Sequence, residues 1–211
     1  MSDGLTVPFA LAAGLSGAIT SSGIVVTAGI AEIVAGSIAM GLGGFLAGKT
    51  EADHYHSELK REYEEVERVP EQEKMEVREV FAGFGISDHL QHEIANEMAK
   101  DKDAWVDFMM RYELGLEKPE ANRATQSAIT IGLSYIVGGI IPLSPYFFIH
   151  DSQQALYYSC IVTSICLFVF GYFKSKVTGQ PPLSGAFKVL IIGALAAAAA
   201  FGMAKVINGG N

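Results

Sequence analysis

Five stretches of the chain are apolar and long enough to cross a membrane as helices. A helix needs about 20 residues to span a hydrocarbon core of about 30 Å. The stretches run over residues 4–48, which a polar turn at residues 20–23 divides in two, and over residues 124–149, 152–173 and 183–207. Between Gly4 and Gly48 the only charged residue is Glu32. The pattern predicts an all-α, polytopic membrane protein with five transmembrane helices.

The segment between the second and third stretches has the opposite character. The chain has 15 Lys and Arg and 23 Asp and Glu, and residues 50–120 hold nine of these bases and 20 of these acids. We therefore expect transmembrane helices 1–2 in residues 1–49, a water-facing acidic helical domain in residues 50–120, and transmembrane helices 3–5 in residues 121–211. The net charge of -8 disfavours binding to nucleic acid and favours cations as partners.

The positions of Lys and Arg predict the orientation in the membrane, because these residues concentrate in cytoplasmic loops. The insert carries nine, and the loop between spans 4 and 5 carries Lys174 and Lys176. We expect the N-terminus and residues 50–120 in the cytosol and the C-terminus on the opposite side. No cleavable signal peptide is expected, because the first apolar run lacks a basic leader. Since helix 1 begins almost at Met1, we expect either a fragment or the loss of a preceding segment.

Two acids and one methionine are candidates for a path through the membrane. Asp3 and Glu32 are the acids in the spans, and intramembrane acids are usually functional. Counting residues from the turn places Asp3 opposite Met40 or Gly41, while Glu32, Gly36 and Met40 share one helix face. Carboxylates with a thioether favour late first-row divalent metals, and protons compete for the carboxylates. The alternatives are that Met40 only packs and that Asp3 is solvated.

The acidic insert has a regular spacing of glutamates. We expect helix 2 to continue to Val69 and end at Pro70, and we expect further helices to about Ala99 and from Ala104 to Leu116. Acids and methionines recur at helical spacing along these helices: Glu58, Glu62 and Glu65; Glu73 and Glu76; Met109, Met110 and Glu113. Two acidic faces on an antiparallel hairpin can converge on a metal. The alternative is an ordinary solvated helix face, which the interleaved bases favour for Glu64, Glu67 and Glu79.

Enzymatic chemistry has little support in the sequence. Glu51 and His54 fit the Glu-x-x-His pattern of di-iron carboxylate bundles once, but such a bundle needs two copies. No nucleophile elbow, phosphate-binding loop or dinucleotide fingerprint is present. We expect a protein that is not an enzyme.

These residues carry a resemblance to a known family. Residues 2–17 (SDGLTVPFALAAGLSG) and residues 29–41 (GIAEIVAGSIAMG) resemble the first and second helix of the vacuolar iron transporters, the plant members above all. The run from Tyr55 to Glu76 looks like the cytosolic metal-binding domain of that family. The resemblance covers nearly the whole chain. It departs at the N-terminus, where family members have residues before the Asp-Gly motif, so any targeting signal there is out of sight.

The resemblance implies a proton-coupled antiporter of the vacuolar membrane. It implies a homodimer of five-helix subunits that moves Fe²⁺ from cytosol to vacuole for storage and detoxification, with Mn²⁺, Zn²⁺ and Co²⁺ as further candidate ions and no prosthetic group. It assigns the pathway to Asp3, Glu32 and Met40. It assigns the cytosolic metal ligands to Glu62, Glu65, Glu73, Glu76, Met109, Met110 and Glu113. The alternative function is a metal-storing or metal-sensing membrane protein without transport activity.

Overall fold

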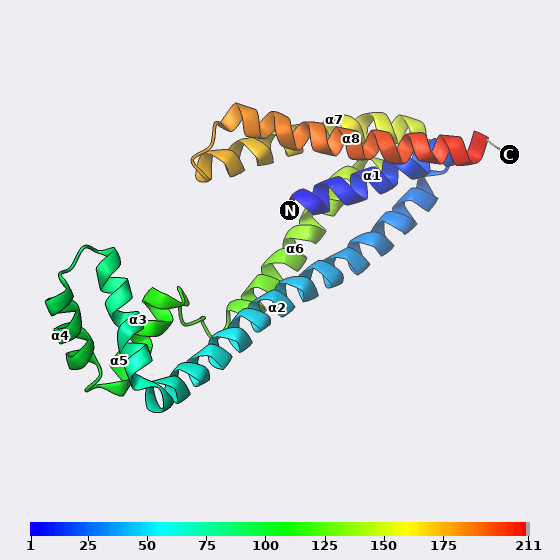
Figure 1. Ribbon diagram of the computed structural model, residues 1–211. Coiled ribbons are helices and arrows are strands. Elements are labelled where there is room, and N and C mark those ends of the chain that lie inside the picture. Colours follow the sequence, from blue (N-terminus) through cyan, green and yellow to red (C-terminus); the bar gives the residue numbers. More distant parts are fainter. Residues whose placement is uncertain (210–211) are drawn as a thin grey trace. The chain divides into compact units, whose positions relative to one another are not determined.

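The computed structural model describes residues 1–209, and these form helices with one isolated β-bridge and no strand. The helices are α1 (Ser2–Ala18), α2 (Ser22–Arg68), α3 (Pro70–Gly83), α4 (Asp88–Met98), α5 (Lys102–Phe108), the π-helix η1 (Met109–Glu113), α6 (Arg123–Leu143), the 3-10 helix η2 (Ser144–Phe147), α7 (Ser152–Val177) and α8 (Pro182–Gly209) (Figure 1). The all-α class expected from the sequence is confirmed.

The helices group into two compact units. A membrane unit combines Met1–Phe45 with the chain from Thr125 onward, and an insert unit comprises Leu46–Ala124. Four helices are long and apolar enough to cross a membrane: α2, α6 continued by η2, α7 and α8. Helix α1 has 17 residues, or about 25 Å, which is less than a full span. The fifth span, and the cytosolic location and metal-binding role of the insert, remain predictions.

Small residues let α1 approach its neighbours closely in the membrane unit. In Figure 1, α1 lies beside α8, and α7 runs antiparallel to α8. A Cβ at Gly17 would stand 3.0 Å from the carbonyl oxygen of Phe201, and Phe9 and Ala13 pack with Ala197. Without a hydrophobic driving force between helices in lipid, such close backbone approach is a main source of helix association.

The polar turn at residues 20–23 is closed by the loop before α7. The amide of Ser22 donates to the carbonyl of His150 at 3.1 Å, and the amide of Ser152 donates to that of Thr20 at 2.9 Å. Asp151 caps α7 by accepting a hydrogen bond from the Gln154 amide at 2.8 Å. These bonds satisfy backbone groups at one end of the membrane unit. The apolar side chains of the spans offer no hydrogen-bond partners for these groups.

The insert folds around a small core of its own. Trp105 and Val106 pack with Met109, Val66 and Val77, which come from α5, η1, α2 and α3. The expected helix breaks are confirmed, because α2 ends at Arg68 before Pro70, which begins α3. The helix expected from Ala104 to Leu116 is present, but it begins at Lys102 and ends at Glu113, and its last part, Met109–Glu113, is a π-helix.

Candidate functional site

Two glutamates of the insert have buried side chains, one on α2 and one on α3. Glu62 of α2 is 1% exposed and Glu73 of α3 is 2% exposed. Each has one carboxylate oxygen, Oε2, that is buried without a hydrogen-bond partner. A buried unpartnered carboxylate oxygen is costly, so such groups are usually satisfied by a proton, a base or a metal ion.

The carboxylates of this cluster also repel one another. Burial, followed by the charges of Glu76 and Glu62, raises the pKa of Glu73 to about 7. Glu113 keeps solvent contact, yet partial desolvation and then Glu76 and Glu62 raise its pKa to about 7. Burial also raises the pKa of Glu62, against a hydrogen bond from Arg61. Glu65 acts on Glu62 and Glu73 through its charge. The five expected glutamates therefore share one electrostatic environment.

Arg61 holds part of this negative charge. Arg61 pairs with Glu58 at 2.8 Å and with Glu65 at 3.3 Å, and its Nη2 lies 3.5 Å from Glu62. Its side chain is half exposed, so it can move away without breaking the core. Arg61 therefore occupies the place of a counter-ion that a divalent cation could replace.

The two candidate methionines lie in the π-helix next to the buried glutamates. Met109 is 0% and Met110 is 1% exposed, and both pack in the same core as Val66 and Val77, one turn after Glu62 and Glu73. The π-turn buries two consecutive methionines and still brings Glu113 to the acidic cluster. π-bulges often occur at functional sites for this reason.

The remaining acids of the insert behave largely as the solvated-face alternative predicts. Glu64 is exposed and pairs with Lys60 at 3.8 Å, and Glu67 pairs with Lys102. Among residues 1–209, no three His, Cys, Asp or Glu side chains are placed closely enough to hold a metal ion. Metal binding by the cluster would therefore need its side chains to draw together.

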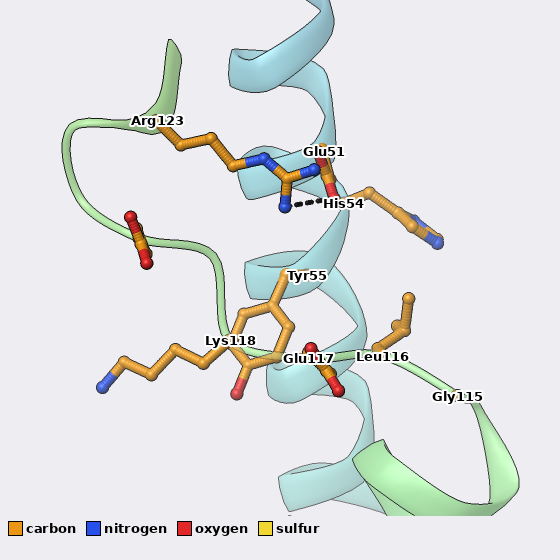
Figure 2. Close-up of a pocket in the computed structure, with 9 residues that line it drawn as sticks. Glu51, His54, Tyr55, Gly115, Leu116, Glu117, Lys118 and Arg123 are labelled. Atoms are coloured by element: carbon orange, nitrogen blue, oxygen red, sulfur yellow. Dashed lines mark ion pairs between the residues drawn. The ribbon is translucent and has the colours of Figure 1, made fainter. Parts of the chain in front are cut away.

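A polar pocket of about 610 Å³ lies where the insert begins and ends (Figure 2). Arg123 reaches from the end of the returning loop to Glu51 on α2, at 3.2 Å. His54 pairs with Glu58 and not with Glu51, because its Nδ1 atom lies 3.8 Å from the Glu58 carboxylate. Glu51 and His54 thus have separate partners.

Glu32 is the polar centre of the membrane unit. It lies about 15 Å along α2 from Ser22 and is partly buried. The hydroxyl of Tyr135 on α6 donates a hydrogen bond to its Oε1. Its Oε2 is buried without a partner among the described residues. Glu32 therefore has one oxygen held in place and one free to take a proton or a metal ion.

Three glycines allow Tyr135 to reach Glu32. A Cβ at Gly36 would stand 2.7 Å from the Tyr135 hydroxyl oxygen, and one at Gly4 would stand 2.6 Å from the Tyr135 carbonyl oxygen. A Cβ at Gly138 would likewise stand 3.0 Å from the backbone of Gly4. Helices α1, α2 and α6 therefore meet at Tyr135, which is 3% exposed. The spacing of charged and apolar residues along the chain does not single out Tyr135.

Asp3 and Met40 are placed differently from Glu32. Both side chains are exposed in the single chain, with Met40 38% exposed. Asp3 immediately precedes Gly4, so it lies at the helix end that contacts α6. The expected pairing of Asp3 with Met40 stays a prediction. Their exposure leaves both available to a neighbouring molecule or an ion.

Replacing Tyr135 by Phe tests whether its hydroxyl positions Glu32. The ring would still fill the space beside Gly36, but Glu32 would lose its only hydrogen-bond donor among the described residues. Because a hydrogen bond to a charged group is worth about 1.5–3 kcal/mol, we expect the cation flux that the family resemblance implies to fall roughly tenfold to 100-fold in vesicles. Tyr146→Phe is the matched control, since it removes a hydroxyl that is 2.9 Å from Ser16 instead. Equal flux in both variants would exclude a positioning role.

The raised pKa values predict how metal binding by the insert depends on pH. A divalent cation that binds this cluster must displace the protons of Glu73 and Glu113, whose pKa values are about 7. If both protons compete, the affinity for Mn²⁺ should fall about 100-fold from pH 8 to pH 6. Calorimetry in buffers of different ionisation enthalpy would measure the affinity and the released protons. An affinity that stays constant over this range would exclude these two carboxylates as ligands.

The fold and these sites define the class of protein: a polytopic helical membrane protein with a carboxylate inside a span and an acidic helical insert. The sequence model of the VIT family matches residues 1–205, so the chain belongs to this family. The resemblance seen in residues 2–17 and 29–41 is thereby confirmed.

Named relatives also place the chain among the vacuolar iron transporters. The chain is 56% identical over 208 residues to "Vacuolar iron transporter 1" of Tulipa gesneriana and to that of Arabidopsis thaliana, covering 99% of this chain and 84% and 83% of those proteins. It is 40% identical over 218 residues to "Protein CCC1" of Saccharomyces cerevisiae, covering 99% of this chain and 67% of that protein. The protein is therefore a transporter and not an enzyme.

Proposed function

We propose that the protein carries Fe²⁺ from the cytosol into the vacuole in exchange for protons. The names of its relatives support iron as the cargo and the vacuolar membrane as the location. The observation that carries the coupling is Glu32, which has one oxygen held by Tyr135 and the other buried and free. A carboxylate in a membrane span can bind either a cation or a proton, and alternation between the two is the minimum requirement for exchange.

The insert collects the ion on the cytosolic side. Glu62, Glu73 and Glu113 hold protons more tightly than isolated glutamates do, so an arriving cation releases protons when it binds. Met109 and Met110 add soft sulfur atoms, which favour Fe²⁺ over Mg²⁺ and Ca²⁺. Glu65 and Glu76 complete the donor set. Mn²⁺, Co²⁺ and Zn²⁺ have the same charge and accept the same donors, so they are candidate cargo as well.

The first site in the membrane uses Asp3 and Met40 from two copies of the chain. One copy offers about two donors, whereas Fe²⁺ commonly takes four to six, so a two-fold axis through the pathway would supply the rest. The exposure of Asp3 and Met40 in the single chain supports this arrangement. Glu32 then takes the ion or the returning proton.

The orientation follows from the distribution of basic residues. The N-terminus and residues 50–120 face the cytosol, and the C-terminus faces the vacuolar lumen, because the lysines and arginines of the loops lie in the insert and around Lys174 and Lys176. The acidic lumen then supplies the protons that drive uptake. The lipid of the bilayer is the only further partner required.

Vesicles containing the purified chain test this function. With an acidic interior, external Fe²⁺ kept reduced by ascorbate should enter and quench trapped calcein at a rate that rises with the pH gradient. Asp3→Ala should lower this rate at least about tenfold, since the cation would lose a ligand at the first membrane site. A trapped pH dye should report proton loss in step with uptake.

The same vesicles distinguish the alternative function. A store or sensor would bind Fe²⁺ through its insert with no flux at any pH gradient, and Asp3→Ala would leave that binding unchanged. Uptake that ignores the gradient would refute proton coupling but not transport.

A further inference from the structure

A basic pocket of about 320 Å³ lies where α7 ends and α8 begins, outside the route proposed for the cation. Its polar lining includes Lys174, Ser175 and Thr178 near the end of α7, Gln180 in the connection, and Ser184 and Lys188 on α8. The two lysines come from different helices, so the fold brings their charges to one cavity.

These two lysines have no acidic partner within their own helices. The sequence contains no Asp or Glu after Asp151, although the chain as a whole has a net charge of -8. The membrane unit has only three acids. Of these, Glu32 binds Tyr135, Asp151 caps the opposite end of α7, and Asp3 lies beside the contact of Gly4 with α6. Two ammonium groups without a carboxylate partner among the described residues of the membrane unit, brought to one cavity, favour an anionic ligand.

The other groups at the pocket suit a phosphate. The side chain of Ser175 is nine-tenths buried and lines the cavity. Helix α8 starts at Pro182, and its first backbone amides lack partners within the helix, which adds partial positive charge near Ser184. A Cβ at Gly185 would collide with Ser175, so this glycine permits the close approach of the two helices. Ammonium groups, hydroxyls and a helix N-terminus together are the usual donors to phosphate oxygens.

The surroundings of the pocket indicate a lipid as the source of this phosphate. Both helices are candidate membrane spans, so their joined ends lie at headgroup depth. Val177 is 86% exposed and Leu183 is 61% exposed at these ends, where acyl chains would cover them.

We propose that this pocket binds the phosphate-bearing headgroup of an anionic phospholipid. That the lipid belongs to the cytosolic leaflet rests on the orientation proposed above, whereas the binding does not. Lys174 and Lys188 hold the phosphate from two sides, and the buried Ser175 hydroxyl donates to it. A lipid held there would fix the ends of α7 and α8 together.

Binding of a fluorescent phosphatidylinositol 4-phosphate to the purified full chain in detergent, followed by anisotropy, tests the proposal. The double variant Lys174→Gln/Lys188→Gln should weaken binding about 30-fold, since each lysine near an anionic surface adds about one factor of five. Lys176→Gln is the matched control, because it removes the same charge from the same segment but does not line the pocket. It should leave the affinity within about twofold of wild type.

Ser184→Phe separates the pocket from the surface charge, since it fills the cavity and keeps every lysine. It should weaken binding as strongly as the double variant. Equal losses for Lys176→Gln and the double variant, unchanged binding by Ser184→Phe, or no binding by the wild type would each overturn the proposal.

Two competitors identify the ligand class. Unlabelled dioctanoyl phosphatidylinositol 4-phosphate should displace the probe, and dioctanoyl phosphatidylcholine should not. Displacement by inorganic phosphate at the same concentration as the lipid would show a free-phosphate site and overturn the assignment to lipid. The assay contains neither metal nor pH gradient, so a failure of iron transport and a failure of lipid binding are observed separately.

Discussion

Glu32→Gln should abolish proton-coupled cation uptake while leaving the membrane unit folded. Glutamine keeps a carbonyl oxygen that can accept the Tyr135 hydrogen bond, so the contact between α2 and α6 is retained. It cannot carry a proton or a negative charge, and both proposed roles of Glu32 need one of these. We expect uptake in vesicles with an acidic interior to fall at least about 100-fold.

The residual flux of Glu32→Gln would separate these roles. If Glu32 carries the proton, downhill cation movement should persist without dependence on the pH gradient. If Glu32 binds the cation, downhill cation movement and proton-driven cation movement should both be lost. Asp151→Asn is the matched control, because it also removes one negative charge from the membrane unit and asparagine still caps α7. Coupled uptake by Glu32→Gln at the rate of this control would refute a role for Glu32.

The helices could be predicted from the sequence because a membrane imposes a simple rule. Backbone groups must be satisfied within each span, so long apolar runs become helices whatever their neighbours are. The break at Pro70 could be predicted for a similarly local reason, since proline has no N–H to donate and its ring clashes with the carbonyl four residues earlier. Both features depend on a few consecutive residues and on no tertiary contact.

Tyr135 could not be found in this way, because its role depends on the register between α2 and α6. One indication was available. Tyrosines in membrane helices concentrate at the interface, but Tyr135 lies about 18 Å from the start of α6 at Arg123. A tyrosine at that depth needs a polar partner, and Glu32 is the acid nearest the middle of a span.

The acidic cluster could be predicted in composition but not in burial. Helical spacing groups Glu62 with Glu65 and Glu73 with Glu76, yet it does not show that Glu62 and Glu73 are the buried members. Burial follows from the packing of Val66 and Val77, one turn further along each helix, against Trp105. The π-helix was missed because one extra residue per turn leaves the spacing of Met109 and Glu113 compatible with an α-helix.

Glu73→Gln should stabilise the metal-free insert and at the same time weaken the metal binding proposed for it. The pKa of Glu73 is about 7 in the folded protein and 4.5 for an ordinary glutamate. Between these values the folded state binds more protons than the unfolded state, so stability falls as the pH rises from about 4.5 to 7. At pH 8 the ionised Glu73 therefore costs up to about 3 kcal/mol, which the neutral amide avoids.

Trp105 makes this measurable in the full chain. It is the only tryptophan and is 3% exposed in the insert core, so its fluorescence on heating reports unfolding of the insert. At pH 8 and without metal, Glu73→Gln should unfold several degrees above wild type, and the difference should shrink at pH 5 as Glu73 takes up its proton. Glu79→Gln on the exposed face of α3 removes the same charge and should match wild type at both pH values.

Added metal should stabilise wild type more than Glu73→Gln, which is the reverse of the order of stability expected without metal. Mn²⁺ should raise the unfolding temperature of wild type and of Glu79→Gln, because it binds the folded insert, but it should have little effect on Glu73→Gln. If Glu73→Gln both raises the stability of the metal-free insert and weakens metal binding, then the carboxylate of Glu73 is buried at a cost in stability because it binds the ion. If Glu73→Gln unfolds below Glu79→Gln at pH 8, or responds to Mn²⁺ as wild type does, then Glu73 is a structural residue of the insert core.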